Sequence, residues 1–112
     1  MSLRKRIGFS AASVLAIAIG ASGALASEPE LKIDSGRFEP ATLTVPANTP
    51  VQLKVTNAGS APIEFESFEL NRERVVTPGQ IVTVFLPSLD AGTYHFFDDF
   101  HRGNGEGTLI AK

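Results

Sequence analysis

The stretch GTYHFFDDFHRGNGEG, residues 92–107, decides how the rest of this chain is interpreted. Strand alternation over its first half places Tyr94, Phe96 and Asp98 on one face. If the two aromatic side chains belong to a core, Asp98 reaches the rim of that core, where a carboxylate needs hydrogen bonds or a cation because an unpaired buried charge is costly. His101 follows three residues later, in a loop whose glycines let the chain fold tightly back. The stretch therefore predicts a strand, a polar loop with candidate ligands, and a closing strand.

Outside this stretch, apolar and polar residues alternate with a period of two between turn residues. The alternating segments lie at 31–34, 42–45, 51–56, 63–66, 74–76, 81–86, 93–97 and 107–111. Segment 81–86 is apolar on both faces, which indicates a central strand or one that bends between two sheets. Segment 67–73 allows at most a helical turn or two. About seven to eight short strands predict an all-β fold, a Greek-key β-sandwich.

The same alternation assigns other side chains to the core or to the surface. Five aromatic residues are expected in the core: Phe38, Phe65, Phe68, Phe85 and Phe96. Glu69 and Glu73 alternate with Arg72 and Arg74, a pattern typical of a salt-bridged surface. His95 is expected to be an exposed strand residue.

Residues 1–26 have the features of a secretory signal peptide. Three basic residues at 4–6 precede a run of small and apolar residues at 7–25, and Ala24-Leu25-Ala26 is a small-x-small cleavage pattern. The alternative is a retained anchor, because the run is nearly long enough to span a bilayer. The many small residues, with no stop-transfer flank, favour cleavage after Ala26. The sequence therefore predicts a signal peptide at 1–26, one domain at 27–112 and a periplasmic protein free of the membrane.

Charge and composition narrow the ligand classes. The 112 residues include 10 Lys and Arg and 12 Asp and Glu, and three of the basic residues lie in the leader. The mature part is therefore acidic, which argues against nucleic acid or an anionic membrane as partner and leaves cations as a plausible ligand. The chain has no Cys, which excludes a disulfide framework, a thiolate metal site and a Cys nucleophile.

Residues 92–107 resemble the last strand, ligand loop and closing strand of cupredoxins, the blue-copper fold. In that family the pattern runs Gly-Thr-Tyr-x-aromatic-x-Cys-x-x-His, followed by a loop that carries a Met. The spacing matches position by position, with Asp98 at the Cys position, His101 at the second His and Glu106 at the Met. The resemblance covers nearly all of the mature part and implies a cupredoxin-like sandwich.

The ligand types depart from those of blue-copper proteins. A type 1 site takes two His and a Cys with a weak axial Met, whereas this chain has no Cys and no Met beyond the initiator. The sequence therefore excludes type 1 copper and a blue-copper electron carrier. Residues 57–62 resemble the turn that precedes the first ligand His; alignment on Pro62 puts Ile63 at the His position, while the chemistry favours Glu64, and both alternatives stay open.

A narrower resemblance is to the cysteine-free cupredoxin-like domains of bacterial iron uptake systems, and segments 63–67 and 96–101 carry it. Such domains occur beside iron permeases or within periplasmic iron-binding components. The resemblance implies a metal site made of carboxylates and an imidazole. The candidate ligands are Glu64, Glu66, Asp98, Asp99, His101 and Glu106. Such ligands suit iron and also accept Cu(II), so the expected cofactor is iron or Cu(II).

Each candidate ligand also has an ordinary structural interpretation. Asp98 suits a turn cap that accepts loop N–H groups, His101 suits a surface loop histidine, and the other acids suit a solvated surface. Phe97 and Phe100 flank the acids, which suits either a cover over the loop or a docking patch for a partner.

The leading hypothesis is a periplasmic metal-binding protein of iron uptake. It would bind or deliver ferrous iron, or assist its oxidation, for an iron permease or a periplasmic iron-binding protein. The sequence carries no recognisable catalytic constellation, so assisted iron oxidation is the one reaction left open. Two alternatives stand beside it: a metal-free protein-interaction module on a cupredoxin scaffold, and a periplasmic Cu(II)-handling protein.

Overall fold

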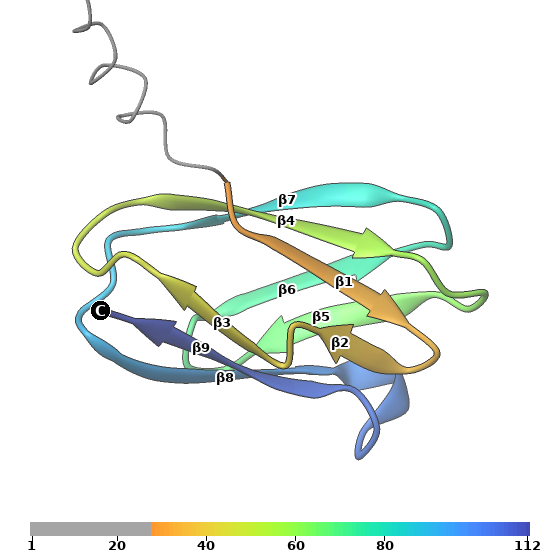
Figure 1. The fold of residues 1–112 in the computed structure, drawn as a ribbon. Coiled ribbons are helices and arrows are strands. Elements are labelled where there is room, and N and C mark those ends of the chain that lie inside the picture. Colours follow the sequence, from red (N-terminus) through yellow and green to blue (C-terminus); the bar gives the residue numbers. More distant parts are fainter. Residues whose placement is uncertain (1–27) are drawn as a thin grey trace, which may run out of the picture.

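Two β-sheets packed face to face make up residues 28–112, which are the residues described in the computed structural model (Figure 1). The elements are β1 (Glu30–Asp34), β2 (Arg37–Glu39), β3 (Thr42–Val45), β4 (Val51–Asn57), β5 (Ile63–Ser67), β6 (Arg72–Val76), β7 (Ile81–Leu86), β8 (Gly92–Asp98), the 3₁₀ helix η1 (Asp99–His101) and β9 (Glu106–Ala111). This confirms the predicted all-β sandwich, with the short β2 as an additional strand. The predicted signal peptide lies outside the described residues.

Long-range pairing sets the order of the strands. One sheet has the order β2-β1-β4-β7 and the other β3-β9-β8-β5-β6. β1 pairs parallel to β4, and β3 pairs parallel to β9, while all other pairs are antiparallel. The chain therefore crosses between the two sheets several times, although β1–β2, β5–β6 and β8–β9 each pair within one sheet, and the closing strand β9 lies between β3 and β8.

The core follows from the period of two. Along β4, Val51, Leu53 and Val55 are buried while Gln52 and Lys54 are exposed, because successive side chains of a strand point to opposite faces. The apolar faces of both sheets meet in one cluster of buried residues.

An aromatic trio fills the core at the end of the sandwich where β8 leads into η1. Phe38 meets Phe96 edge-on with ring centroids 5.0 Å apart, and Phe65 lies 5.4 Å from Phe96. All three are buried, as predicted. The trio therefore packs next to the end of β8, where Phe65 lies opposite Asp98 and the loop with the candidate ligands begins.

Two aromatic residues expected in the core are at the surface instead. Phe68 is 68% exposed and Phe85 is 62% exposed. Phe68 lies in the turn that joins β5 to β6, and Phe85 faces outward on β7. The segment 67–73 is this hairpin turn and the start of β6, not a helical turn.

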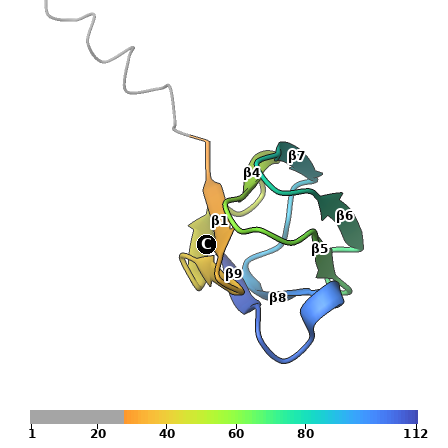
Figure 2. The same ribbon diagram turned by 90° about the vertical axis from the view of Figure 1, so that its right-hand side faces the viewer.

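β7 is an edge strand, so the central or bent position expected for it is wrong. Its outward carbonyls are covered from the other sheet: Arg72 Nε donates to Phe85 O at 2.8 Å, and an Arg74 Nη donates to Thr83 O at 3.1 Å. Figure 2 shows β6 beside β7 at this side of the sandwich. These arginines therefore cover the exposed edge of β7. In the described part of the chain they do not form the predicted ion pairs with Glu69 and Glu73, and Glu69 instead pairs with His95 at 2.8 Å.

Within residues 28–112, the structure contains no helix with the length and apolar character needed to cross a membrane.

Candidate metal centre

Asp98 ends β8 on the inner face of its sheet and is completely buried. Its carboxylate is fully engaged: Oδ1 accepts hydrogen bonds from the main-chain N–H groups of Glu64 and Phe100, each at 3.0 Å, and Oδ2 lies 2.7 Å from Nδ1 of His101. Asp98 is thereby the N-cap of η1. Buried carboxylates need such partners.

His101 is held by this carboxylate at the surface. Because a carboxylate accepts hydrogen bonds but does not donate them, Nδ1 carries the proton in this contact, and in the neutral imidazole Nε2 keeps a lone pair. Ile63, Asp98 and His101 all line one cleft of about 440 Å³. These are the three positions at which the cupredoxin resemblance places the two His and the Cys.

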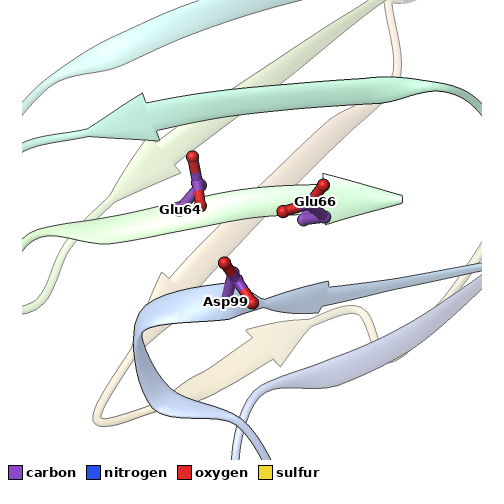
Figure 3. Close-up of side chains that lie close together, drawn as sticks. All are labelled: Glu64, Glu66 and Asp99. Carbon is purple, nitrogen blue, oxygen red and sulfur yellow. The ribbon is translucent and has the colours of Figure 1, made fainter. Parts of the chain in front are cut away.

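A second group of ligands lies on the outer face of the same sheet. Glu64 and Glu66 point outward from β5, and Asp99, the first residue of η1, points toward them (Figure 3). Oxygen atoms of these three carboxylates all lie within 4.8 Å of one another. Alternation puts the two glutamates on one face, and the Asp98 cap starts η1 so that Asp99 turns outward.

The surroundings of the cluster disfavour the charged form of its two glutamates. Desolvation by the surrounding chain raises the pKa of Glu64, and the neighbouring Asp99 carboxylate raises it further. Desolvation also raises the pKa of Glu66, with a further contribution from Glu73, its partner in the β5–β6 register. Arg102 opposes this effect on Glu66, and its Nε lies 2.6 Å from Asp99 Oδ1. The negative charge of the acids in and beside the cluster therefore exceeds the positive charge that Arg102 supplies.

The structure divides the six predicted ligands into three places. Glu64, Glu66 and Asp99 come together, and Asp98 and His101 form a pair on the inner side of the loop. Glu106 is opposite Phe97 in the β8–β9 register, and Phe97 is in turn opposite Glu66. An aromatic side chain therefore separates Glu106 from the cluster.

Sequence reasoning assigned no site role to two residues beside the cluster. Glu73 lies opposite Glu66 because β5 and β6 form a hairpin. Assigning residues 67–73 to a hairpin turn would have predicted this neighbour. Arg102 reaches Asp99 and also stacks on Phe97, with its guanidinium carbon 4.9 Å from the ring centroid. Asp99 and Arg102 are three residues apart in the sequence, and this spacing could have indicated their contact.

Convergent carboxylates suit hard cations. Oxygen ligands of this kind bind Mg²⁺, Ca²⁺, Mn²⁺ and iron. The anionic charge stabilises a ferric ion more than a ferrous ion. The sheet face is open, so water can complete the coordination sphere.

Comparisons with known proteins agree with the fold. A family model described as "Cupredoxin-like domain" matches residues 9–111. An uncharacterized protein of Rickettsia prowazekii (strain Madrid E) is 35% identical over 85 residues, which are 76% of this chain and 68% of that protein.

Two solved structures are similar in fold. A chain of a heme-copper terminal oxidase dimer has a TM-score of 0.63 at 16% identity; the match covers 74% of this chain and 63% of that one, so this chain spans less than two thirds of its length. A purple cupredoxin from Nitrosopumilus maritimus has a TM-score of 0.60 at 19% identity, with 76% of this chain and 100% of that one covered. At such identities the similarity shows the fold alone.

Proposed function

This chain belongs to the cupredoxin-like domain family, and from that premise we propose that it binds iron through Glu64, Glu66 and Asp99 and serves iron uptake. It is a family member without cysteine, so it has no type 1 copper site and any ion must be held by oxygen and imidazole ligands. The proposed ion site lies on the outer face of β5, beside the loop where other cupredoxins hold copper.

The main support for this proposal is that three carboxylates lie close together on the outer face of β5 and η1. Their ligand oxygens lie within 4.8 Å of one another, and the carboxylates of Glu64 and Glu66 have a raised pKa because desolvation and neighbouring acids disfavour their charge. Both effects make the charged carboxylates less favourable in the absence of a cation, and a bound cation favours their charged form. The narrower sequence resemblance favours iron.

The proposed role places the protein in the periplasm, where it receives iron and passes it to an iron permease or a periplasmic iron-binding protein. An open site on a sheet face supports transfer better than storage, because a partner's ligands can approach the ion directly. Three anionic ligands favour Fe(III), which would also assist oxidation of bound Fe(II) by an external acceptor.

A metal-free interaction module is the second candidate, and the exposed aromatic residues favour it. Phe68 is 68% exposed, and Phe100 is 49% exposed immediately after Asp99. Exposed aromatic residues beside acids suit a protein interface.

Calorimetric titration of the metal-free protein tests the proposal. The ligands are Fe(II) without oxygen, Fe(III), Mn(II), Zn(II) and Cu(II), and the variants are Glu64→Gln and Asp99→Asn, with Glu106→Gln as the matched control. We expect saturable iron binding that weakens at least about ten-fold in the two cluster variants and is unchanged in Glu106→Gln. Binding no tighter than about millimolar, or about 4 kcal/mol, would favour the interaction module.

Growth separates the iron role from copper handling. A strain that lacks this protein should grow poorly on limiting iron and recover with the wild type, but not with the Glu64→Gln/Asp99→Asn double variant. Normal growth on limiting iron together with sensitivity to copper would instead identify a Cu(II)-handling protein.

A further inference from the structure

We propose that Asp98 is the positioning residue of the carboxylate cluster: its buried side chain fastens η1 to β5 and thereby brings Asp99 against Glu64. This inference rests on the proposed function, and it assigns the residue at the former Cys position a role other than ligation. The evidence is the hydrogen-bond geometry of a side chain with 0% exposure.

Both hydrogen bonds to Asp98 Oδ1 come from segments that carry cluster residues. The Glu64 N–H donates from β5 at 3.0 Å, across a sequence separation of 34 residues. The Phe100 N–H donates from η1, also at 3.0 Å, directly after Asp99. A single oxygen atom therefore joins the two segments whose side chains converge on the opposite face of the sheet.

The position of this oxygen is itself fixed from several sides. The main-chain N–H of Asp98 donates to Gly105 O at 2.8 Å, and a Cβ on Gly105 would lie only 3.2 Å from Asp98 Cβ. In the ladder, Asp98 is opposite Phe65, whose ring is buried. The close approach of Gly105 and the ladder contact with Phe65 thus hold the main chain of Asp98 in place, so that its carboxylate is a fixed point to which the two amides bind.

The Asp98→Asn variant separates positioning from ligation. An asparagine Oδ1 can accept the same two N–H groups, so it preserves the connection between β5 and η1. Its Nδ2 donates, however, and faces His101 Nδ1, which must then give up its proton; the proton moves to Nε2 and blocks that atom as a ligand. A positioning role survives this substitution, whereas ligation by Asp98 or by His101 does not.

The experiment compares Asp98→Asn, Asp98→Ala and His101→Ala with the wild type, using Fe(III) and Mn(II) as probes and circular dichroism to verify folding. We expect Asp98→Asn and His101→Ala to bind both ions as the wild type does, and Asp98→Ala to bind at least about ten-fold more weakly. Loss of binding in folded Asp98→Asn would overturn the inference, and so would wild-type binding in Asp98→Ala.

Two readouts without metal keep the inference testable if Asp98→Ala unfolds or if the wild type binds no ion. Hydrogen exchange at the Glu64 and Phe100 amides should stay slow in Asp98→Asn, and the crystal structure of that variant should keep the Glu64 and Asp99 carboxylates together. Fast exchange or separated carboxylates would overturn the positioning role. Absence of metal binding in the wild type, with both readouts as expected, would overturn the proposed function alone.

Discussion

Arg102 carries the positive charge that contacts the carboxylate cluster directly. Its Nε donates to Asp99 Oδ1 at 2.6 Å, and its guanidinium lies over the rings of Phe97 and Phe68. In the empty protein this side chain partly neutralises the acids, so a metal ion must compete with it for Asp99. The aromatic rings keep the guanidinium close, which agrees with the proposed transfer of the ion to a partner.

Removing this cation should strengthen metal binding. For Arg102→Gln we expect an affinity about five-fold higher, because a charge contact at an exposed site contributes about 1 kcal/mol. The measurement is the calorimetric titration with Mn(II) or Fe(III). Lys54→Gln makes the same change of charge on the other sheet and should leave the affinity unchanged; equal affinities for Arg102→Gln and the wild type would contradict the prediction.

Metal binding should weaken at mildly acidic pH. Ions bind the deprotonated acids, and the pKa values of Glu64 and Glu66 are raised. Protons therefore begin to compete at a higher pH than they would at an ordinary glutamate. Titrations from pH 7 to about pH 5 should show a steady loss of affinity with release of protons; an affinity independent of pH over that range would exclude these residues as ligands.

The same shifts predict how stability without metal depends on pH. The folded state holds the Glu64 proton more tightly than the unfolded chain, so stability falls as pH rises from the ordinary pKa through the raised one, and the loss is complete above both. Glu64→Gln removes this penalty. It should raise the melting temperature at neutral pH and have no such effect near pH 3, with Glu39→Gln as the control acid outside the cluster.

At the scale of the elements, β9 packs closely on the aromatic trio. Gly107 of β9 lies opposite Phe96 of β8. A Cβ added to Gly107 would lie 2.4 Å from Phe96 Cζ and 2.9 Å from Ala41 O. Phe96 is buried against two other rings, which limit how far its own ring can shift. Only glycine therefore allows β9 to lie against β8 beneath the candidate site.

Gly107→Ala should destabilise the fold by about 1–3 kcal/mol, the usual cost of overpacking a core. Urea denaturation followed by circular dichroism measures it. Gly92→Ala is the matched control at the other end of β8, because its Cβ would meet nothing closer than 3.9 Å. Equal midpoints for the two variants would show that Phe96 repacks freely.

At the scale of the whole molecule, the sequence predicts a signal peptide at residues 1–26 ahead of the sandwich. The predicted cleavage after Ala26 leaves a protein that begins at Ser27. When the 112-residue chain is expressed in a bacterium with a periplasm, we expect intact mass spectrometry of the periplasmic fraction to show this N-terminus. A product that retains residues 1–26 in the membrane fraction would instead support the anchored alternative.

Sequence patterns were sufficient for the fold because alternation is a local property. A period of two identified the strands, placed Phe96 and Asp98 on the inner face, and placed Glu64 and Glu66 on the outer face. The same local rule failed for Phe68 and Phe85. Phe68 is exposed because it lies in a turn, and Phe85 is exposed because it faces outward on an edge strand. Alternation alone specifies neither the turn nor the position of a strand in its sheet.

The sequence by itself determined that this is a cupredoxin-like β-sandwich without a type 1 copper site, since strand periodicity, loop spacing and the lack of cysteine are all properties of the chain as written. Only the tertiary structure decided which acids meet. Alternation turns the neighbours Asp98 and Asp99 to opposite faces, but it does not specify which acid Asp99 meets there. Asp99 lies against Glu64 because β8 pairs with β5 and because Asp98 accepts the Glu64 N–H across 34 residues of sequence, and no local pattern specifies these long-range contacts.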